Sequence, residues 1–365
     1  MSDSTFGFIG LGLIGGSIAR GLRRANKDIT IMAYMRTRSK LEQAKADGTI
    51  DIILDGIDET LFACDVIFLC TPVEYNAVYL EKVRPFLKPG ALITDIGSTK
   101  TDIHQAVERL GYEDVFVGGH PMAGSEKTGY QAATAYLLEN AYYILTPTAK
   151  TDTTVLHAFR DYIASLGSVP MIMDAKTHDH ATASISHLPH IIAASLVNLI
   201  RETDDENETM KTIAAGGFKD ITRIASSSPV MWQHICASNR EQILTLIDRY
   251  TEELNTMRSL IAERKEKEIY DFFSHAKDYR DSITITSSGP LRKVFECYCD
   301  LIDEAGGIAT IATILASNNI SIKNIGIIHN REFENGVLRI ELYEEEALNC
   351  AIALLRKYHY TVYER

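Results

Sequence analysis

The segment TFGFIGLGLIGG, residues 5–16, constrains the fold more than any other part of the chain. A short apolar run leads directly into Gly10-x-Gly12-x-x-Gly15, and an apolar-periodic segment that suits a helix follows it. Gly10 permits a tight turn, Gly12 lets backbone approach a pyrophosphate, and Gly15 lets helix and strand pack closely. The alternative is a glycine-rich turn without a ligand. The context favours a dinucleotide site, whose expected contacts are Gly10, Leu11, Gly12, Leu13, Ile14 and Gly15.

The segments that follow alternate between strand and helix patterns. ITIMAY (29–34), DVIFLCTP (65–72) and ALITDIGSTK (91–100) are apolar runs that end in polar or breaking residues. This rhythm predicts a Rossmann-like doubly wound parallel sheet over residues 1–172. Ligands lie beyond the carboxyl ends of such strands, so Thr71, Pro72 and Ser98 are expected near the nicotinamide.

The end of the second expected strand bears on the choice of cofactor. An acidic residue that binds the ribose hydroxyls is expected about 20 residues after the glycines. This chain has Met35 there, followed by Arg36 and Arg38. We expect NAD, and the two arginines also leave room for the 2′-phosphate of NADP. Alternatively, Arg36 stacks on adenine and Arg38 is solvated.

The dozen residues GGHPMAGSEKTG, 118–129, combine four glycines and a proline with titratable side chains. The glycines and the proline disfavour a regular helix or a central strand. The preceding segment VFVGGH (115–120) has the pattern of a strand, so this loop is expected to leave its carboxyl end. His120 would then lie over the same crevice as Ser98. A histidine beside a nicotinamide can accept a proton from a substrate hydroxyl as hydride departs.

Helical periodicity replaces strand alternation over residues 173–285 and predicts an all-helical second domain. Its long apolar faces predict a homodimer. Metal binding is a possible use of its histidines, but Pro189 disturbs the spacing and we expect no metal. The histidines in the first part of this domain are His178, His180, His187 and His190.

Further along, AAGGFKDITRIASSSPVMW (214–232) surrounds a glycine pair with charged residues. Lys219 and Arg223 are spaced i and i+4, which places them on one face of a helix and suits a carboxylate ligand. The alternative is a surface ion pair with Asp220.

Composition limits the class of partner and the compartment. The formal net charge is -12, which argues against nucleic acid or an anionic membrane as a general partner. The six cysteines form no paired CxxC units, and no stretch resembles a membrane span or a cleaved leader. A cytoplasmic protein is therefore expected.

Taken together, GLGLIGGS, TPVE, TDIGSTK, GGHPMAGSEKTG, SHLPH and GGFKDITRIASSSPVMW resemble the prephenate dehydrogenase family of tyrosine biosynthesis, which includes arogenate-using members. The resemblance covers nearly the whole chain. It implies oxidative decarboxylation of prephenate to 4-hydroxyphenylpyruvate. His120 would be the base, Ser98 would orient it, and Arg223 would bind the substrate carboxylate. The other substrate-binding residues that it implies are His187, His190, Gly216, Lys219, Asp220, Ser125, Glu126 and Trp232, with Trp232 coming from the same or a neighbouring subunit.

Residues 290–365 follow a linker and show the order β-α-β-β-α-β, which is ferredoxin-like. This part resembles an ACT domain, a module that commonly binds an amino acid. The usual Asp-x-Pro-Gly loop of that family reads Asp303-Glu304-Ala305-Gly306 here, with Ala305 in place of proline. The resemblance implies a regulatory site for L-tyrosine at Asp303, Ala305, Gly306, Ile308 and Asn324.

Two other functions remain open from the sequence. An arogenate dehydrogenase would use a substrate with an amino group in place of the keto group. A sensor without enzymatic activity would combine a dinucleotide fold with an amino-acid-binding module, and it would be expected to lack a complete catalytic set. Ser98, His120 and Arg223 are all present, which favours an enzyme.

Overall fold

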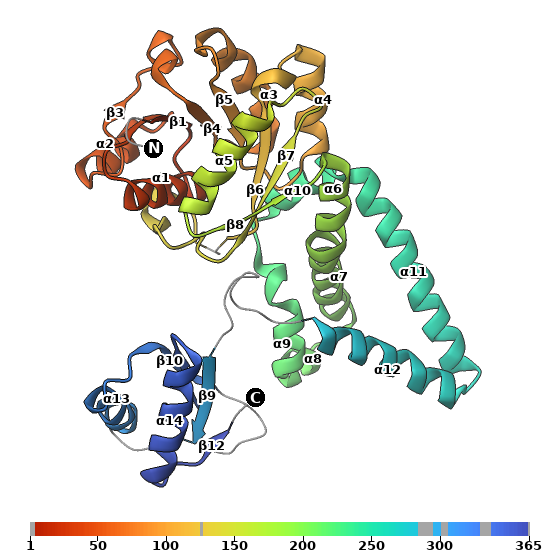
Figure 1. Cartoon of the computed structure of the whole chain (residues 1–365). Helices are drawn as coiled ribbons and strands as arrows, with labels where there is room; N and C mark the ends of the chain where they lie inside the picture. The colour runs from red at the N-terminus through yellow and green to blue at the C-terminus, as the bar shows by residue number, and fades with distance from the viewer. Residues whose placement is uncertain (1–3, 125–126, 284–294, 301–305, 329–336, 364–365) are drawn as a thin grey trace. The chain divides into compact units, whose positions relative to one another are not determined.

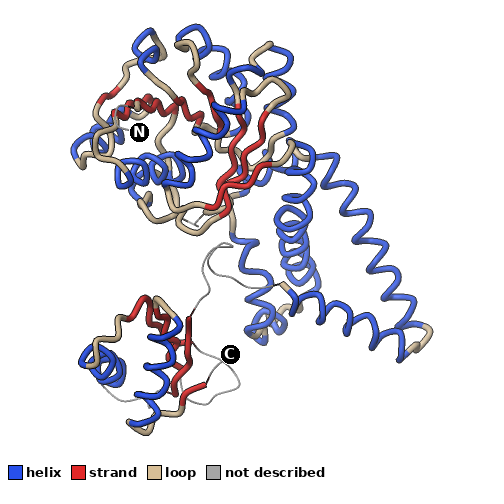
Figure 2. The backbone as a smooth tube through the Cα atoms, viewed as in Figure 1, coloured by secondary structure: helices blue, strands red, loops and turns tan. Residues whose placement is uncertain are grey.

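The computed structural model describes residues 4–124, 127–283, 295–300, 306–328 and 337–363. Its contacts divide the chain into two compact units, Met1–Thr284 and Ile285–Arg365. In the first unit the strands gather in one part and helices alone form the other (Figures 1 and 2). The parts expected at 1–172 and 173–285 therefore belong to one compact unit.

The first part of this unit is built on a five-stranded parallel sheet with strand order β3-β2-β1-β4-β5. Its strands are β1 (Thr5–Ile9), β2 (Thr30–Tyr34), β3 (Ile52–Ile53), β4 (Val66–Leu69) and β5 (Leu92–Asp95). This is the order of the doubly wound dinucleotide-binding fold. A single parallel bridge, Ile93 to Phe116, links β5 to a second sheet of order β6-β7-β8. The strands of the second sheet are β6 (Val117–Pro121), β7 (Tyr142–Pro147) and β8 (Val169–Ile172).

Helices cover both faces of the parallel sheet, because alternate strand residues point to opposite sides. Phe8 and Phe68 belong to a core with α1, α2 and α5, whereas Ile9 and Ile67 pack with α3 and α4. These helices are α1 (Leu13–Ala25), α2 (Arg38–Ala46), α3 (Val73–Val83), α4 (Thr101–Leu110) and α5 (Thr153–Ser165). Short 3₁₀ turns connect them at η1 (Glu59–Ala63), η2 (Arg84–Phe86), η3 (Glu113–Val115) and η4 (Tyr130–Ala132).

The first part of the glycine-rich segment is a strand, as the pattern of residues 115–120 predicts, and this strand extends to Pro121. Gly118, Gly119, His120 and Pro121 all lie within β6, which pairs antiparallel with β7. A Cβ atom on Gly119 would lie 2.6 Å from the Asp95 carbonyl oxygen, and one on Gly118 would clash with Thr146 Oγ1. The glycines therefore serve close packing of β6 against β5 and β7.

Residues from 175 onward are helical, as the periodicity predicts. A continuous helix over 175–203 consists of α6 (Ala175–Thr182), the π-helical turn η5 (Ala183–His187) and α7 (Leu188–Thr203). By length and composition this helix could cross a membrane, which the sequence analysis did not expect. The remaining elements are α8 (Thr209–Ile213), α9 (Gly216–Thr222), η6 (Arg223–Ser226), α10 (Pro229–Ser238), α11 (Arg240–Ala262) and α12 (Glu266–Ser282).

The second unit has the β-α-β-β-α-β order expected from its sequence. Its antiparallel sheet has strand order β10-β11-β9-β12. The elements are β9 (Phe295–Asp300), α13 (Gly307–Ser317), β10 (Ile322–Ile328), β11 (Val337–Leu342), α14 (Glu345–Lys357) and β12 (Val362–Tyr363). One face of the sheet buries Cys297, Leu338 and Ile340 against α13 and α14.

Candidate active site

The glycine motif forms a cradle at the junction of β1 and α1. Gly10 has a φ of +93°, and a Cβ atom there would lie 2.7 Å from the Cys70 carbonyl oxygen. A Cβ atom on Gly15 would lie 2.9 Å from Cys70 Sγ, so this glycine lets α1 approach the end of β4. On Gly12 a Cβ would meet no atom within 4 Å. Gly12 is the N-cap of α1 and provides no side-chain cap. The N-terminus of α1 therefore has open space and unpaired N–H groups suited to a pyrophosphate.

The residues expected around the rest of a dinucleotide lie at the carboxyl ends of neighbouring strands. Thr71 follows β4 and donates its hydroxyl to Asn76 Oδ1 at 2.8 Å, and Pro72 caps α3. At the end of β2, Arg38 is paired with Asp55 and Glu42. Arg36 is exposed and has no ion-pair partner among the residues that the structure describes.

His120 is joined to a buried pair on α6. Its Nδ1 lies 2.7 Å from His178 Nε2, and His178 Nδ1 lies 2.8 Å from Asp179 Oδ1. His178 is 0% exposed and Asp179 is 1% exposed, whereas His120 is only half-buried. Within the described part of the chain, Nε2 of His120 has no hydrogen-bond partner. This nitrogen is therefore the one that can receive a substrate proton.

Asp179 is held in turn by the sheet. Its two carboxylate oxygens accept hydrogen bonds from the backbone N–H groups of Lys100 (2.8 Å) and Thr101 (2.7 Å). Asn239 donates its side-chain amide to the Asp179 carbonyl oxygen at 2.8 Å. Burial opposes ionisation of Asp179, but the hydrogen bonds from His178, Thr101 and Lys100 outweigh it and lower the pKa of this carboxyl.

A second buried pair, Lys100 and Asp95, lies under the site. Both side chains are 0% exposed, and the ammonium donates to Asp95 Oδ2. The same carboxylate accepts the N–H of Gly97 at 2.8 Å and that of Gly119 at 3.2 Å. Asp95 thereby joins the end of β5, the loop that carries Ser98, and the strand that carries His120. Burial lowers the pKa of Lys100, and the attraction of Asp95 works against that change.

These surroundings keep His120 neutral. Burial lowers its pKa well below the ordinary value, and the neighbouring His178, Lys100 and His187 lower it further. A neutral imidazole at physiological pH is ready to accept a proton.

The π-helical turn brings a second group of aromatic side chains next to this one. π-turns often occur at functional sites. His187 lies at its end, 3.2 Å from Asn239 Nδ2, and its ring meets that of Trp232 edge-on at a centroid distance of 5.9 Å. The ring of His190 also packs against Trp232, with ring centroids 4.0 Å apart. The expected residues His187, His190 and Trp232 are thus in contact within a single chain.

Trp232 is half-buried and lines a cavity of about 560 Å³ with residues of α7 and η6. Other residues that line it are His190, Ile191, Ser195, Ile224, Ser227 and Gln233. Its indole N–H is buried without a hydrogen-bond partner among the described residues. A buried polar atom without a partner is rare in folded proteins, so this one marks Trp232 as a candidate functional residue.

The charged residues expected to bind a carboxylate lie close by in sequence and fold. Lys219 and Asp220 are exposed on α9, and Gly216 is its first residue. Arg223 is not in α9 but begins η6, whose following residues line the cavity. Ser125 and Glu126 lie outside the described residues. Ser98 is half-exposed, and the described partner of His120 Nδ1 is His178.

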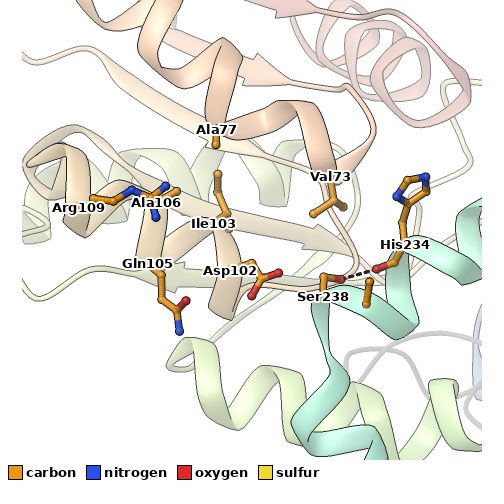
Figure 3. A pocket seen from close by; sticks show the side chains of 10 residues that line it. Val73, Ala77, Asp102, Ile103, Gln105, Ala106, Arg109, His234 and Ser238 are labelled. Atoms are coloured by element: carbon orange, nitrogen blue, oxygen red, sulfur yellow. Dashed lines mark hydrogen bonds between the residues drawn. The ribbon is translucent and has the colours of Figure 1, made fainter.

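A smaller hollow of about 400 Å³ lies between α3, α4 and α10 (Figure 3). Asp102 of α4 and Ser238 of α10 both line it, and Ser238 donates to the His234 carbonyl oxygen at 2.9 Å. Thr99 Oγ1 in turn lies 2.9 Å from Ser238 Oγ. The hollow follows the seam between the sheet and the helices and lies next to the loop that carries Ser98.

Sequence reasoning did not assign Asp95, Lys100, His178 or Asp179 to the site. Asp95 and Lys100 stand inside TDIGSTK, and the HDH run contains His178 and Asp179. The available signal was a carboxylate followed five residues later by a lysine at a strand end. Within the described residues, no group of three or more His, Cys, Asp or Glu side chains could hold a metal ion.

In the second unit, the residues expected at a regulatory site are only partly described. Gly306 has a φ of +95° and caps α13, a conformation that favours glycine. Ile308 is 37% exposed, and Asn324 donates to Glu341 Oε1 at 3.5 Å. Asp303 and Ala305 lie outside the described residues.

The buried histidines predict a pH dependence of stability. Burial lowers the pKa of His187 to about 4, below the value of about 6.5 for an exposed histidine. The unfolded chain therefore binds the extra proton first, and stability is lost as pH falls from 6.5 towards 4. Between pH 7 and pH 4 the free energy of unfolding should fall less in His187→Gln than in the wild type. We expect the two losses to differ by on the order of 3 kcal/mol.

Thermal unfolding at the two pH values measures this difference. The exposed His180, bonded to Gln242 at 3.0 Å, provides the control His180→Gln, which should follow the wild type. Parallel losses in the wild type and His187→Gln would refute the prediction.

Two family models match the chain over its first unit. The model for the prephenate dehydrogenase nucleotide-binding domain matches residues 18–172, and that for the prephenate dehydrogenase dimerization domain matches residues 174–278. Prephenate dehydrogenase of Bacillus subtilis (strain 168) is 38% identical over 339 residues, which cover 92% of this chain and 91% of that protein. This match extends beyond the first unit.

Solved structures agree with these matches. The crystal structure of prephenate dehydrogenase from A. aeolicus, in complex with hydroxyphenyl propionate and NAD+, is 32% identical with a TM-score of 0.73 and covers 78% of this chain and 99% of that one. The Synechocystis arogenate dehydrogenase structure is 31% identical with a TM-score of 0.70 and covers 76% and 99%. The chain belongs to the prephenate dehydrogenase family.

Proposed function

We propose that this enzyme oxidises and decarboxylates prephenate to 4-hydroxyphenylpyruvate, with NAD+ as the hydride acceptor, in the cytoplasm. The observation that carries the proposal is the placement of His120. It stands on a strand beside the carboxyl ends of a dinucleotide-binding sheet, with Nδ1 held by His178 and Nε2 without a partner among the residues that the structure describes. This is the arrangement that removal of a hydroxyl proton next to a nicotinamide requires.

The proposed roles follow from where each side chain lies. His120 takes the proton of the ring hydroxyl, and Ser98, on the adjacent loop, orients the substrate and the nicotinamide. Arg223 binds a substrate carboxylate. Around it, the remaining substrate contacts that we propose are His187, His190, Gly216, Lys219, Asp220, Trp232, Ser125 and Glu126.

The reaction needs little covalent chemistry from the protein. Bound oxidised nicotinamide supplies the hydride acceptor for the ring carbon that carries the hydroxyl. His120 removes the hydroxyl proton as that carbon is oxidised, and loss of the ring carboxylate as CO2 then makes the ring aromatic. The phenolate oxygen takes the proton back from His120, so protons balance. The protein therefore mainly positions the substrate, holds one proton and binds an anion.

The preference for NAD+ or NADP+ depends on the side chains at the end of β2. Because Arg38 is already paired with Asp55 and Glu42, Arg36 is the cation there that can meet a 2′-phosphate. We propose that the enzyme uses NAD+ and that Arg36 also allows it to accept NADP+.

Arogenate is the second candidate substrate. A solved relative of similar fold is an arogenate dehydrogenase, and a relative from Zymomonas mobilis, 32% identical over 74% of this chain, is a cyclohexadienyl dehydrogenase. The two substrates differ in a side-chain keto or amino group, which lies away from His120 in either reaction.

Steady-state rates with prephenate and arogenate, each with NAD+ and NADP+, test the proposed activity. We expect turnover of prephenate with NAD+. His120→Ala should lower kcat by about 10²-fold or more, because general base catalysis is lost, while KM changes less. His157→Ala, on α5 outside the site, is the control. No turnover in any of the four combinations would refute the proposal.

We further propose a homodimer formed through the helical part. The family model that matches residues 174–278 is that of a dimerization domain. Only 17% of the most apolar stretch of the helix over 175–203 is buried within the chain. Large apolar side chains that are exposed on α7, α10 and α11 include Val197, Leu199, Val230, Met231, Leu244 and Leu254.

The solution mass tests this proposal. At micromolar concentration, light scattering should give twice the chain mass of 40.6 kDa. Leu199→Lys, at a side chain that is 57% exposed, should weaken the dimer, because a charge would be buried at the interface. A wild-type monomer at this concentration would contradict the dimer.

Finally, we propose that the second unit is an ACT domain and that L-tyrosine inhibits the enzyme through it. Its β-α-β-β-α-β topology and the glycine-dependent turn at Gly306 support this. The match to the Bacillus subtilis relative extends into this unit.

Inhibition by L-tyrosine can be compared in the full chain, in Asn324→Ala and in a chain that ends at Thr284. We expect the half-inhibitory concentration to rise about 10-fold in Asn324→Ala, because one ligand hydrogen bond is lost. Inhibition should be absent from the shortened chain. If the shortened chain is active and as sensitive as the full chain, this regulatory role is wrong.

A further inference from the structure

We propose that His178 stores the proton that His120 removes from the substrate, with Asp179 as its counter-ion. His178 is a positioning residue that acts through His120 and does not itself touch the substrate. The inference rests on the proposed proton transfer at His120 and extends it to a buried relay of two histidines and a carboxylate.

The protonation of the relay follows from Asp179. Its oxygens accept hydrogen bonds from two backbone N–H groups, those of Lys100 and Thr101, and these can only donate. The lowered pKa of the Asp179 carboxyl means that it is ionised at neutral pH. An ionised carboxylate is an acceptor only. The hydrogen of the 2.8 Å bond between His178 Nδ1 and Asp179 Oδ1 therefore belongs to His178.

The orientation of the second bond follows from the first. A neutral His178 with its hydrogen on Nδ1 has a lone pair on Nε2. The 2.7 Å contact between His178 Nε2 and His120 Nδ1 then requires His120 to donate. His120 consequently has its lone pair on Nε2, the nitrogen without a partner among the described residues. Through two successive hydrogen bonds, the buried Asp179 carboxylate thus selects the His120 tautomer whose Nε2 can accept a proton.

The bond between the two histidines can carry a proton inward. When Nε2 of His120 takes the hydroxyl proton, its Nδ1 hydrogen passes to His178 Nε2. His120 is then neutral again in its other tautomer, and His178 is an imidazolium beside the Asp179 carboxylate. No atom leaves the protein and no electrons are exchanged in this step. After CO2 is lost, the phenolate recovers a proton from His120 Nε2, and the proton on His178 Nε2 moves back to His120 Nδ1.

The electrostatics favour storage at His178 over storage at His120. A cation on His120 would be disfavoured by burial and by the nearby ammonium of Lys100. His178 has the Asp179 carboxylate in direct contact, which can stabilise an imidazolium. Titratable or charged groups that surround the relay are Asp95 on β5, Lys100 and Asp102 at the start of α4, His120 on β6, Asp179 on α6 and His187 on η5.

Burial of the two inner residues of the relay keeps them from contact with water. His178 and Asp179 are within 1% of full burial, so a stored proton is screened from exchange with water during the interval between oxidation and decarboxylation. The half-exposed His120 is the part of the relay that can reach a substrate.

The substitution His178→Gln separates storage of the proton at residue 178 from the positioning of His120. The glutamine carbonyl oxygen can accept the hydrogen bond from His120 Nδ1, but an amide does not take up a proton at neutral pH. We expect kcat with prephenate to fall about 10²-fold, with KM changed less than about threefold. His180→Gln on the same helix is the matched control and should keep wild-type kcat. A kcat within about threefold of wild type in a folded His178→Gln protein would overturn the proposal.

The pH profile of kcat is the second readout. In the wild type, the proton-accepting tautomer of His120 is set through its 2.7 Å bond to His178, so the acid limb of the profile belongs to the coupled pair. In His178→Gln only His120 can titrate, and we expect the acid limb to move to lower pH by more than about 0.5 unit. A loss of kcat without movement of this limb would indicate a merely structural role and would overturn the storage step.

If His178→Gln does not fold, His178→Ala with added imidazole provides the same test. Imidazole should restore kcat in a saturable way, whereas pyrazole, which has similar shape but is a much weaker base, should not. Equal effects of the two compounds, or no rescue by imidazole, would overturn the proposal. Turnover of prephenate by the wild type is measured alongside, so failure of the proposed reaction is distinguished from failure of the relay.

Discussion

The rest of the first unit depends on the hydrogen bonds that the Asp179 carboxylate accepts from backbone N–H groups. This carboxylate comes from α6 in the helical part, yet it accepts the N–H groups of Lys100 and Thr101 at the beginning of α4 in the sheet part. Lys100 is the N-cap of α4 and gives that helix no side-chain cap. Asp179 therefore caps α4 from another part of the chain, where the helix dipole also favours an anion.

This capping interaction has a functional consequence because of the residue next to it. His178 lies directly before Asp179 on the same helical turn, and its ring lies between Asp179 and His120. The carboxylate that links the two parts of the unit is thus also the group that fixes the ring orienting the base. Removing the carboxylate would leave helix N–H groups unsatisfied and would release His178, so stability and catalysis are coupled at this position.

The glycine-rich segment shows how far its sequence could be interpreted. The prediction that a strand brings His120 to the crevice is consistent with the structure, since β6 includes that residue. Pro121, which together with the glycines was expected to disfavour a central strand, is the last residue of β6. Gly118 and Gly119 fit a strand whose neighbours approach too closely for any side chain, and the nearest atoms are Thr146 Oγ1 and the Asp95 carbonyl oxygen. Those partners are 24 to 28 residues away, and local pattern holds no information about them.

The sequence by itself determined the parallel dinucleotide-binding sheet, the change to helices near residue 175 and the β-α-β-β-α-β order of the second unit, because periodicity and glycine spacing are local properties. It also singled out His120, His190 and Trp232. Only the tertiary structure decided which groups surround them. His178, Asp179, Lys100 and Asp95 are buried polar residues, and a buried polar group acquires its role from its hydrogen-bond partners. Those partners come from distant segments, so folding alone brings them together.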